Sequence, residues 1–421
     1  RQKKDSSYST NNDIEKVVLV GIDNDKNDIE LNLLELEELA KTSGAEVVGQ
    51  LVQKRESPHT TTYLGKGKLT ELKDYVSLTE ATGVICDDEL NSRQIKNMSD
   101  ILDIKVMDKT MIILDIFAQR ALSAEGKAQV ELAQLKYNSS RLIGMGKVLS
   151  RQGAGIGTRG PGEKKLETDR RHIRGRISEL ESQIREIRTQ RKVQREKRKK
   201  SNIPVLSLVG YTNAGKSTLM NYLTDANVLS EDKLFATLDT TTRKLTLSNQ
   251  EVLFTDTVGF IQKLPHTLIK AFNATLEELK YADILIHVVD ASSDYYERQM
   301  DTVYETLLEL ECNNKDIICV YNKIDLLDKN NPKEDDRANS TVNISAVTGE
   351  GIDTLISEIE TIVNKMGEVK ELVVPFSEGK LQDYLHKNSK ILETEFREDG
   401  VYFKIIANDE VKNSIEEFLI K

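Results

Sequence analysis

Tryptophan is absent from this 421-residue sequence, cysteine is rare, and no long apolar run occurs. The three cysteines, Cys86, Cys312 and Cys319, form no C-x-x-C pair. We therefore expect small buried thiols in a reducing cytoplasm. No apolar segment approaches the roughly 18–20 residues that are needed to cross a bilayer, so we expect no membrane span.

Signals of secretion and of common hydrolases are missing as well. Residues 1–13 lack the hydrophobic region of a secretory signal, and we expect them to form a disordered tail. Because the chain does not start with methionine, we expect the numbering to begin inside a longer product. No H-E-x-x-H motif, Ser-His-Asp arrangement or pair of carboxylates stands out as a catalytic centre.

Charge, by contrast, is abundant and unevenly distributed. Hydrophobic residues make up 38% and charged residues 30%, which is typical of a globular protein with a well-solvated exterior. The length suits three modest domains. The net charge is −10, yet residues 141–200 contain 19 lysines and arginines against 7 acidic residues. The total charge therefore hides a basic segment.

Residues 14–108 alternate between strand and helix patterns. Apolar runs at 17–22, 47–52, 83–86 and 105–107 indicate strands, and 29–40 indicates a helix. This order predicts an N-terminal α/β subdomain with a small parallel sheet covered by helices. Gly65, Lys66, Gly67 and Lys68 lead into a further helix. They could hold a phosphate there, although an ordinary turn is the simpler interpretation.

Residues 109–200 are expected to form a helical hairpin. Helices are predicted at 108–121, at 128–137 and from about 163 to 200, and the last one carries a narrow apolar seam of coiled-coil type. The seam consists of Leu166, Ile173, Ile177, Leu180, Ile184 and Ile187. Residues 144–162, between the helices, contain seven glycines and no acidic residue, which predicts a mobile tip loop.

Both this loop and the end of the long helix are basic. Residues 185–200 contain nine basic and two acidic residues, and such a run in isolation is usually a solvated helix face. Joined to a basic, glycine-rich loop, it favours contact with nucleic acid, because phosphate contacts release counterions and glycines allow close backbone approach. The candidate RNA contacts are Arg151, Gln152, Gly153, Gly155, Gly157, Thr158 and Arg159.

A buried-strand pattern at 205–209 runs directly into the motif G-x-x-x-x-G-K-S. Its glycines let backbone N–H groups turn around a phosphate, and the following helix directs its positive end at the same anion. Lys216 is expected to reach the β and γ oxygens, and the Ser217 hydroxyl to ligate Mg²⁺. The motif consists of Gly210, Tyr211, Thr212, Asn213, Ala214, Gly215, Lys216 and Ser217.

Two further segments are expected to respond to a third phosphate and, with Lys216, to act in catalysis. In the first segment a threonine should close over the γ-phosphate and complete the Mg²⁺ shell; Thr237 is favoured, with Thr240 and Thr241 as alternatives. In the second, Asp256 should hold the water shell of Mg²⁺ and the Gly259 N–H should sense the γ-phosphate. The two segments are Phe235, Ala236, Thr237, Leu238 and Asp239, and Asp256, Thr257, Val258 and Gly259.

The base is expected to be guanine. A strand pattern at 317–321 ends in N-K-x-D, and a carboxylate at Asp325 can accept from guanine N1–H and the 2-amino group, which adenine does not offer. A last strand at 341–344 is followed by residues whose backbone can reach guanine O6. The two segments are Asn322, Lys323, Ile324 and Asp325, and Ser345, Ala346 and Val347. With the phosphate motif they define a P-loop GTPase domain at 201–365.

One position departs from the usual pattern for hydrolysis. Phe260 follows D-x-x-G, where Ras-like proteins carry the glutamine that orients the attacking water. An apolar side chain cannot do this, so we expect slow intrinsic hydrolysis that a partner completes. His266 is a candidate substitute, although a surface histidine is the simpler interpretation, and His287 inside an apolar strand is expected to be a core residue.

The C-terminal residues 366–421 have a β-α-β-β-α pattern with a hairpin turn at Asp399 and Gly400. We expect a small α+β domain there. The predicted fold class is therefore α/β: a P-loop GTPase domain with a mostly parallel sheet, preceded by a small parallel subdomain and a helical hairpin, and followed by this α+β domain.

Several motifs together are typical of one family. They are GYTNAGKSTL, FATLD, DTVGF and NKID, with LDIFAQRA, QVELAQLKY and QGAGIGTRGPGEKKLE at residues 114–121, 129–137 and 152–167. On these motifs the chain resembles the HflX family of translational GTPases over roughly residues 14–365. Two positions differ from the family pattern: Thr240 stands where many members have proline, and Ala154 where glycine is usual.

The resemblance implies a role at the ribosome. The GTP form would bind the large (50S) ribosomal subunit and its rRNA and split stalled or hibernating ribosomes under stress. Ribosome-stimulated GTP hydrolysis would drive release, with GTP/GDP and Mg²⁺ as cofactors. We expect a cytoplasmic protein that is monomeric when free. Peripheral association with membranes would be through ribosomes.

Two other functions are compatible with parts of the sequence. The first is an ATP-dependent, helicase-like RNA-remodelling enzyme in the N-terminal half, with a secondary ATP site there and GTP as a regulator. The second is a septin-like structural or membrane GTPase, which the lack of a lipidation motif or amphipathic anchor disfavours.

Overall fold

The computed structural model describes most of the chain. Residues 1–13, 26–27, 153–160, 202, 225–233, 237, 239, 249–250, 263–267, 269–275, 277, 328–332, 408 and 421 lie outside the description. Only the backbone is described for 140, 142–152, 161–169, 192–201, 366, 368, 390, 409 and 410. The contacts divide the chain into two compact units: unit 1 comprises 1–185, 232–239 and 262–273, and unit 2 comprises 186–231, 240–261 and 274–421.

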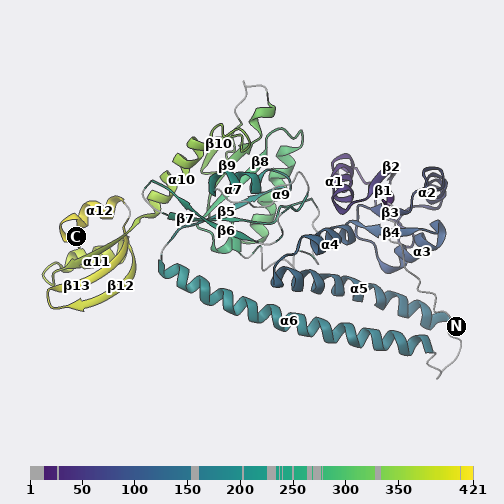
Figure 1. Ribbon diagram of the computed structural model, residues 1–421, viewed down its shortest axis with the longest axis horizontal. Helices are drawn as coiled ribbons and strands as arrows, with labels where there is room; N and C mark the ends of the chain where they lie inside the picture. The colour runs from purple at the N-terminus through teal and green to yellow at the C-terminus, as the bar shows by residue number, and fades with distance from the viewer. Residues whose placement is uncertain are drawn as a thin grey trace, which may run out of the picture. The chain divides into compact units, whose positions relative to one another are not determined.

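Unit 1 begins with a four-stranded parallel sheet, as the alternating pattern predicted (Figure 1). Its strands, in the order β2-β1-β3-β4, are β1 (Lys16–Asp23), β2 (Glu46–Lys54), β3 (Gly83–Cys86) and β4 (Lys105–Asp108). The helices α1 (Ile29–Ser43), α2 (Lys66–Thr79) and α3 (Ser92–Leu102) connect them. Within the predicted Gly-Lys-Gly-Lys turn, Gly65 caps α2 and the following residues already belong to the helix.

Three more helices follow: α4 (Lys109–Arg120), α5 (Ala124–Gln152) and α6 (Pro161–Ser201). Asp108, directly before α4, links the start of α4 to the middle of α5, because its carboxylate accepts from the Met111 N–H at 3.0 Å and from the Tyr137 hydroxyl at 2.5 Å. The side chain of Asp108 is fully buried, and burial raises its pKa against the opposing effect of Arg141.

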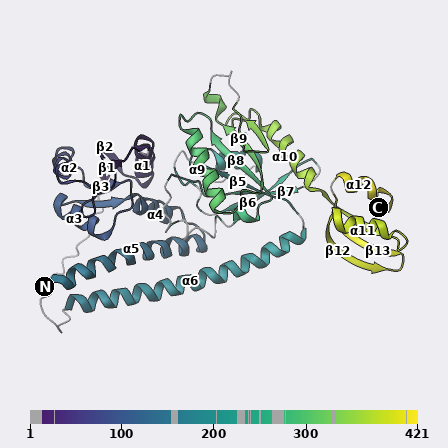
Figure 2. The same ribbon diagram turned by 180° about the vertical axis from the view of Figure 1, so that it is seen from behind.

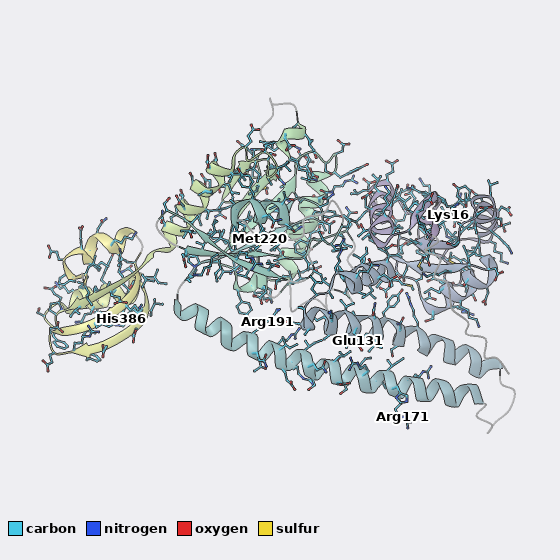
Figure 3. The ribbon with its side chains drawn as sticks, viewed as in Figure 1. Lys16, Glu131, Arg171, Arg191, Met220 and His386 are labelled. Carbon is cyan, nitrogen blue, oxygen red and sulfur yellow. The ribbon has the colours of Figure 1, made fainter. Side chains whose placement is uncertain are left out.

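The predicted pairing of α5 with α6 is confirmed. Ala128 and Leu132 of α5 pack against Leu180 and Ile184 of α6, so part of the predicted seam is the contact surface. Beside them the Arg176 guanidinium donates to both carboxylate oxygens of Glu131, at 2.6 and 2.8 Å. Glu131 lies on α5, and Arg171 on α6 is exposed (Figure 3).

The predicted extent of the tip loop was wrong. We expected a loop over 144–162, but α5 continues to Gln152 and α6 starts at Pro161. Within 144–152 the two glycines stand among residues with good helix propensity, including Met145, Lys147 and Leu149, and this outweighs the cost of about 1 kcal/mol for each glycine. Proline is well tolerated in the first turn of a helix, which suits the start of α6.

Unit 2 contains a six-stranded sheet in the order β10-β9-β8-β5-β7-β6, parallel except for β6, which pairs antiparallel with β7 (Figure 2). Its strands are β5 (Val205–Gly210), β6 (Thr241–Thr246), β7 (Glu251–Asp256), β8 (Ile284–Asp290), β9 (Asp316–Asn322) and β10 (Ser340–Asn343). One face packs against α7 (Lys216–Thr224) and α10 (Ile352–Met366), where Met220 of α7 is fully buried (Figure 3). The other face packs against α9 (Tyr296–Glu309).

The predicted β-α-β-β-α order of the C-terminal residues is confirmed. The elements are β11 (Glu368–Val374), α11 (Gly379–Asn388), β12 (Lys390–Arg397), β13 (Gly400–Ala407) and α12 (Asp409–Ile415), with a 3₁₀ turn at Glu416–Phe418. The three strands form an antiparallel sheet in the order β11-β13-β12, and Arg397 pairs with Gly400 at the hairpin. Where the structure describes the chain, none of the helices has the length and apolarity to span a bilayer.

Candidate nucleotide-binding site

The phosphate motif forms the turn between β5 and α7, and its glycines are required by the backbone. Gly210 has a φ of 151° and Gly215 a φ of 94°, and Asn213 also has a positive φ, of 62°. A Cβ atom on Gly210 would lie 2.2 Å from the Val288 carbonyl oxygen, and one on Gly215 would lie 2.2 Å from Asn322 Nδ2. Any larger residue would therefore displace a neighbouring strand or the base motif.

Lys216 lies at the first position of α7 and is almost completely buried. Its Nζ donates to the carbonyl oxygens of Gly210, at 3.1 Å, and Tyr211, at 2.6 Å. Burial lowers the pKa of this ammonium group to about 8, although Asp256 opposes the effect. A buried cation held by carbonyl groups beside a helix N-terminus is suited to receive phosphate oxygens.

The two residues predicted to surround a metal ion lie together. The Ser217 hydroxyl donates to Asp256 Oδ2 at 2.7 Å, and Asp256 is fully buried at the end of β7. A hydroxyl and a carboxylate are oxygen donors of the kind that Mg²⁺ prefers. This pair therefore fits a magnesium ion carried by a nucleotide. The adjacent Thr257 hydroxyl donates to the Leu208 carbonyl at 2.6 Å and fixes the loop to β5.

The D-x-x-G segment lies against the phosphate motif. The Phe260 N–H donates to the Gly210 carbonyl at 3.1 Å, and the Thr212 N–H donates to the Phe260 carbonyl at 2.8 Å. A Cβ atom on Gly259 would lie 2.9 Å from Thr212 Cα and 3.0 Å from Lys216 Nζ. Glycine is thus the residue that lets this backbone approach the lysine closely. The Phe260 side chain is buried in the core on the α9 face, so it cannot orient a water molecule.

The base motif is tied to the phosphate motif through Asn322. Its Nδ2 donates to the Ala214 carbonyl at 2.9 Å, and its Oδ1 accepts from the Ala346 N–H at 2.9 Å. Lys323, with a φ of 66°, forms an ion pair with Asp290 at 2.6 Å. The Asp290 contact was not predicted, although its position at the end of a buried strand was a signal. Among the other motif residues Ser345 is buried, whereas Asp325 and Val347 are exposed.

The segment before β6 is described only in part. Leu234, Phe235 and Leu238 are buried, Ala236 is half-buried, and Thr237 and Asp239 lie outside the described residues. The alternative Thr241 is the first residue of β6 and pairs with Asp256, while Thr240 directly precedes the strand.

Other predicted residues fall in or near the undescribed parts of the chain. His266 lies there, as do the predicted RNA contacts Gly153, Gly155, Gly157, Thr158 and Arg159. Arg151 and Gln152 belong to α5, where only the backbone is described.

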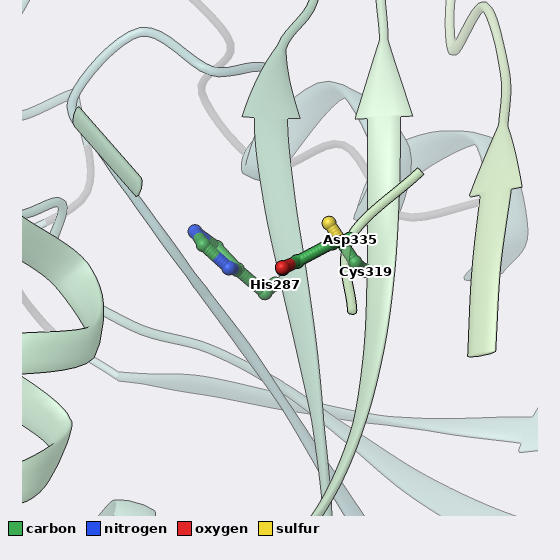
Figure 4. Close-up of side chains that lie close together, drawn as sticks. All are labelled: His287, Cys319 and Asp335. Carbon is green, nitrogen blue, oxygen red and sulfur yellow. The ribbon is translucent and has the colours of Figure 1, made fainter. Parts of the chain in front are cut away.

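A separate cluster of His287, Cys319 and Asp335 has the composition of a metal site, with ligand atoms within 4.8 Å of one another (Figure 4). However, Asp335 already accepts from the Tyr304 hydroxyl at 2.5 Å and from Arg337 Nε at 3.1 Å. His287 is buried against Tyr304, and burial lowers its pKa to about 3. We interpret the cluster as part of the core, and the prediction of a core histidine is confirmed.

Comparison with known proteins identifies the family. Family models match four consecutive parts of the chain: GTP-binding GTPase N-terminal at 30–118, GTP-binding GTPase Middle Region at 120–198, 50S ribosome-binding GTPase at 205–323 and HflX C-terminal domain at 331–413. A GTPase HflX of Lacrimispora saccharolytica is 52% identical over 404 residues, which cover 95% of each chain. The chain belongs to the HflX family of GTPases.

Other HflX proteins are similar over most of their length. GTPase HflX of Caldanaerobacter subterraneus is 50% identical over 97% of this chain and 94% of that protein, and GTPase HflX of Escherichia coli is 41% identical over 92% of each. A crystal structure of a GTP-binding protein from Sulfolobus solfataricus in complex with GDP covers 83% of this chain and 98% of that chain, at 24% identity and a TM-score of 0.45. As an HflX-family member the chain is a GTPase, which confirms the predicted nucleotide and reaction.

Proposed function

We propose that this chain is a GTP-driven factor that binds the large ribosomal subunit and splits stalled or hibernating ribosomes. The proposal is supported by the family model for a 50S ribosome-binding GTPase, which matches residues 205–323. The single observation that carries the switching part of the proposal is the backbone pairing of Phe260 with Gly210 and Thr212. It holds the Gly259 backbone beside Lys216, where a third phosphate would lie.

Each part of the site has a role in this cycle. The N–H groups of the phosphate motif and Lys216 bind the phosphates, and Asp325 accepts from the guanine base. Ser217, Asp256 and a threonine, Thr237 by preference, would hold Mg²⁺, which neutralises charge on the β- and γ-phosphates. The Gly259 N–H donates to the γ-phosphate, so that hydrolysis removes its acceptor and releases the segment.

The ribosomal contact is assigned to the basic part of the chain. Residues 185–200 contain nine basic residues, and the sequence directly before α6 is rich in glycine. Contacts of this kind with rRNA phosphates weaken steeply as salt is added, because binding releases counterions. The large subunit would also supply the group that completes hydrolysis, since Phe260 cannot orient the attacking water.

Sedimentation of 70S ribosomes in sucrose gradients tests the proposal. With GTP or a non-hydrolysable analogue, the chain should shift the 70S peak into 50S and 30S peaks, and with GDP it should not. Lys216→Ala should abolish splitting because it removes the buried cation of the phosphate site. Lys244→Ala is a matched control, since Lys244 lies on β6 in an exposed pair with Glu251. Unchanged 70S, 50S and 30S peaks with every nucleotide would refute the proposal.

A further inference from the structure

Gln262, which lies three residues after the D-x-x-G segment, is held by two side chains that are very distant in sequence. The Gln262 N–H donates to Glu35 Oε2 at 3.2 Å, and the Gln262 carbonyl accepts from Lys109 Nζ at 3.1 Å. The backbone N–H and the backbone carbonyl of Gln262 are therefore both hydrogen-bonded by one ion pair. Glu35, Lys109 and Gln262 all belong to unit 1.

This ion pair is buried. Lys109 Nζ lies 2.6 Å from Glu35 Oε1, and the two side chains are only 2% and 5% exposed. Asp87, also buried, lies 3.6 Å from the same Nζ. Burial alone would lower the pKa of Lys109, but Glu35 and Asp87 outweigh it and raise the pKa, so the ammonium group stays charged.

Three buried charges are costly to a fold. Burial removes each ion from water, and an apolar cluster of the same volume is often at least as stable. Two of the three side chains, Glu35 and Lys109, hydrogen-bond the backbone of Gln262. This indicates that the cluster positions the segment rather than only stabilising the sheet.

The held residue is close in sequence to the phosphate site. Only Ile261 separates Gln262 from Phe260, and the Phe260 backbone is paired with the phosphate motif. The chain is therefore fixed at both ends of a three-residue stretch that begins directly after Gly259. Only Phe260 and Ile261 separate Gln262 from Gly259, the glycine that lies beside Lys216.

The helix that provides Lys109 also contacts the other switch segment. Phe117 of α4 packs edge-on against Phe235, with ring centroids 4.7 Å apart. Phe235 is buried and lies two residues before Thr237. Helix α4 thus contacts Phe235, in one of the two segments expected to sense the γ-phosphate, and Gln262, three residues beyond the other.

We propose that Lys109 and Glu35 are positioning residues for the GTPase reaction, which hold the Gln262 backbone so that Gly259 remains beside the phosphate motif. The inference rests on the role of Gly259 in the proposed function. If the ion pair is lost, the Gly259 backbone lies beside the phosphate motif for a smaller fraction of the time and is less available to a third phosphate. Affinity for a GTP analogue and kcat then fall, whereas affinity for GDP, which has no γ-phosphate, is retained.

The test compares three variants with a matched control. Lys109→Met removes the donor, Glu35→Gln removes the charge of the acceptor, and the double variant leaves a neutral pair of nearly the same volume. Lys105→Met is the control, because Lys105 lies four residues earlier in an exposed pair with Glu15 at 3.2 Å. Dissociation constants for GDP and for a non-hydrolysable GTP analogue, kcat and KM are measured for each folded protein.

We expect a loss of at least fivefold in analogue affinity and in kcat for Lys109→Met and for the double variant, with GDP affinity within twofold of the wild type. The losses of analogue affinity and kcat for Glu35→Gln should be smaller than those for Lys109→Met and the double variant. Lys105→Met should have the analogue affinity and kcat of the wild type. An unchanged ratio of analogue to GDP affinity in the folded variants would overturn the inference. Failure of the wild-type chain to shift the 70S peak with any nucleotide would instead contradict the proposed function.

Hydrogen exchange of the wild-type chain tests the same contact without mutation. The Gln262 amide should exchange more slowly with the GTP analogue than with GDP, because the ion pair and the γ-phosphate hold neighbouring peptide groups. Equal exchange of this amide in the two complexes would also overturn the inference, and this measurement applies even if a variant fails to fold.

Discussion

At the scale of single residues, Lys216 combines two properties that compete with each other. Binding of phosphate needs a charged ammonium group, but burial favours the neutral form and lowers the pKa of Lys216 to about 8. The phosphates of a bound nucleotide restore the preference for the charged form. Binding above pH 8 must therefore include uptake of a proton.

This predicts a pH dependence of GDP affinity. Between pH 7 and 8 the dissociation constant should change little, and between pH 8 and 9 it should rise about fivefold, approaching about tenfold per unit above that. Isothermal titration calorimetry at pH 9 in two buffers of different ionisation enthalpy should show uptake of nearly one proton. For Lys216→Arg we expect a flat profile, because arginine does not titrate in this range. A flat profile in the wild type would contradict the role of the buried lysine.

Residue-level motifs were also the most predictable part of the site. The fixed positions Gly210 and Gly215 follow from backbone geometry that the spacing G-x-x-x-x-G-K-S already implies. By contrast, the contact of Lys109 and Glu35 with Gln262 joins positions 153 and 227 residues apart, and no periodicity or spacing reports it. The pairing of Lys323 with Asp290 was also missed, although both residues stand at the ends of buried strands that the sequence predicted.

At the scale of secondary-structure elements, buried strands were predicted well because both faces of a parallel sheet are apolar. Helix α3, strand β6 and the helices α9 and α10 were not identified. The missed β6 is an edge strand with exposed Arg243 and Lys244, so it has no apolar run to reveal it. For α3 a signal was present, since Asn91 and Gln94 form a capping box.

The contact of α5 with α6 leads to a prediction about stability at this scale. Leu180 is 1% exposed and packs on α5, so Leu180→Ala should lower the free energy of unfolding of the hairpin by about 2–5 kcal/mol. Leu78→Ala is the control, because Leu78 is 81% exposed and the change should be within about 0.5 kcal/mol. Hydrogen exchange of the α5 and α6 amides measures both. Equal protection in the two variants would contradict the packing of α5 against α6.

At the scale of the whole molecule, a nucleotide site and a basic hairpin belong to one chain. The net charge of −10 conceals a segment, 141–200, with 19 basic residues, so local charge rather than total charge indicates the partner. The fold class could be predicted because each domain has its own pattern of strands and helices. How strongly the nucleotide and the hairpin influence each other is an energetic quantity, which no sequence pattern reports.

The central claim is that the third phosphate of GTP controls binding to the large ribosomal subunit. The most direct test is the affinity of the chain for isolated 50S subunits in three conditions: with a non-hydrolysable GTP analogue, with GDP and without nucleotide. All three dissociation constants are measured at one salt concentration. The account predicts binding at least tenfold tighter with the analogue than with GDP or without nucleotide, and loss of this difference in Lys216→Ala. Equal affinity of the wild-type chain in all three conditions would show that the third phosphate does not control ribosome binding, and would contradict the account.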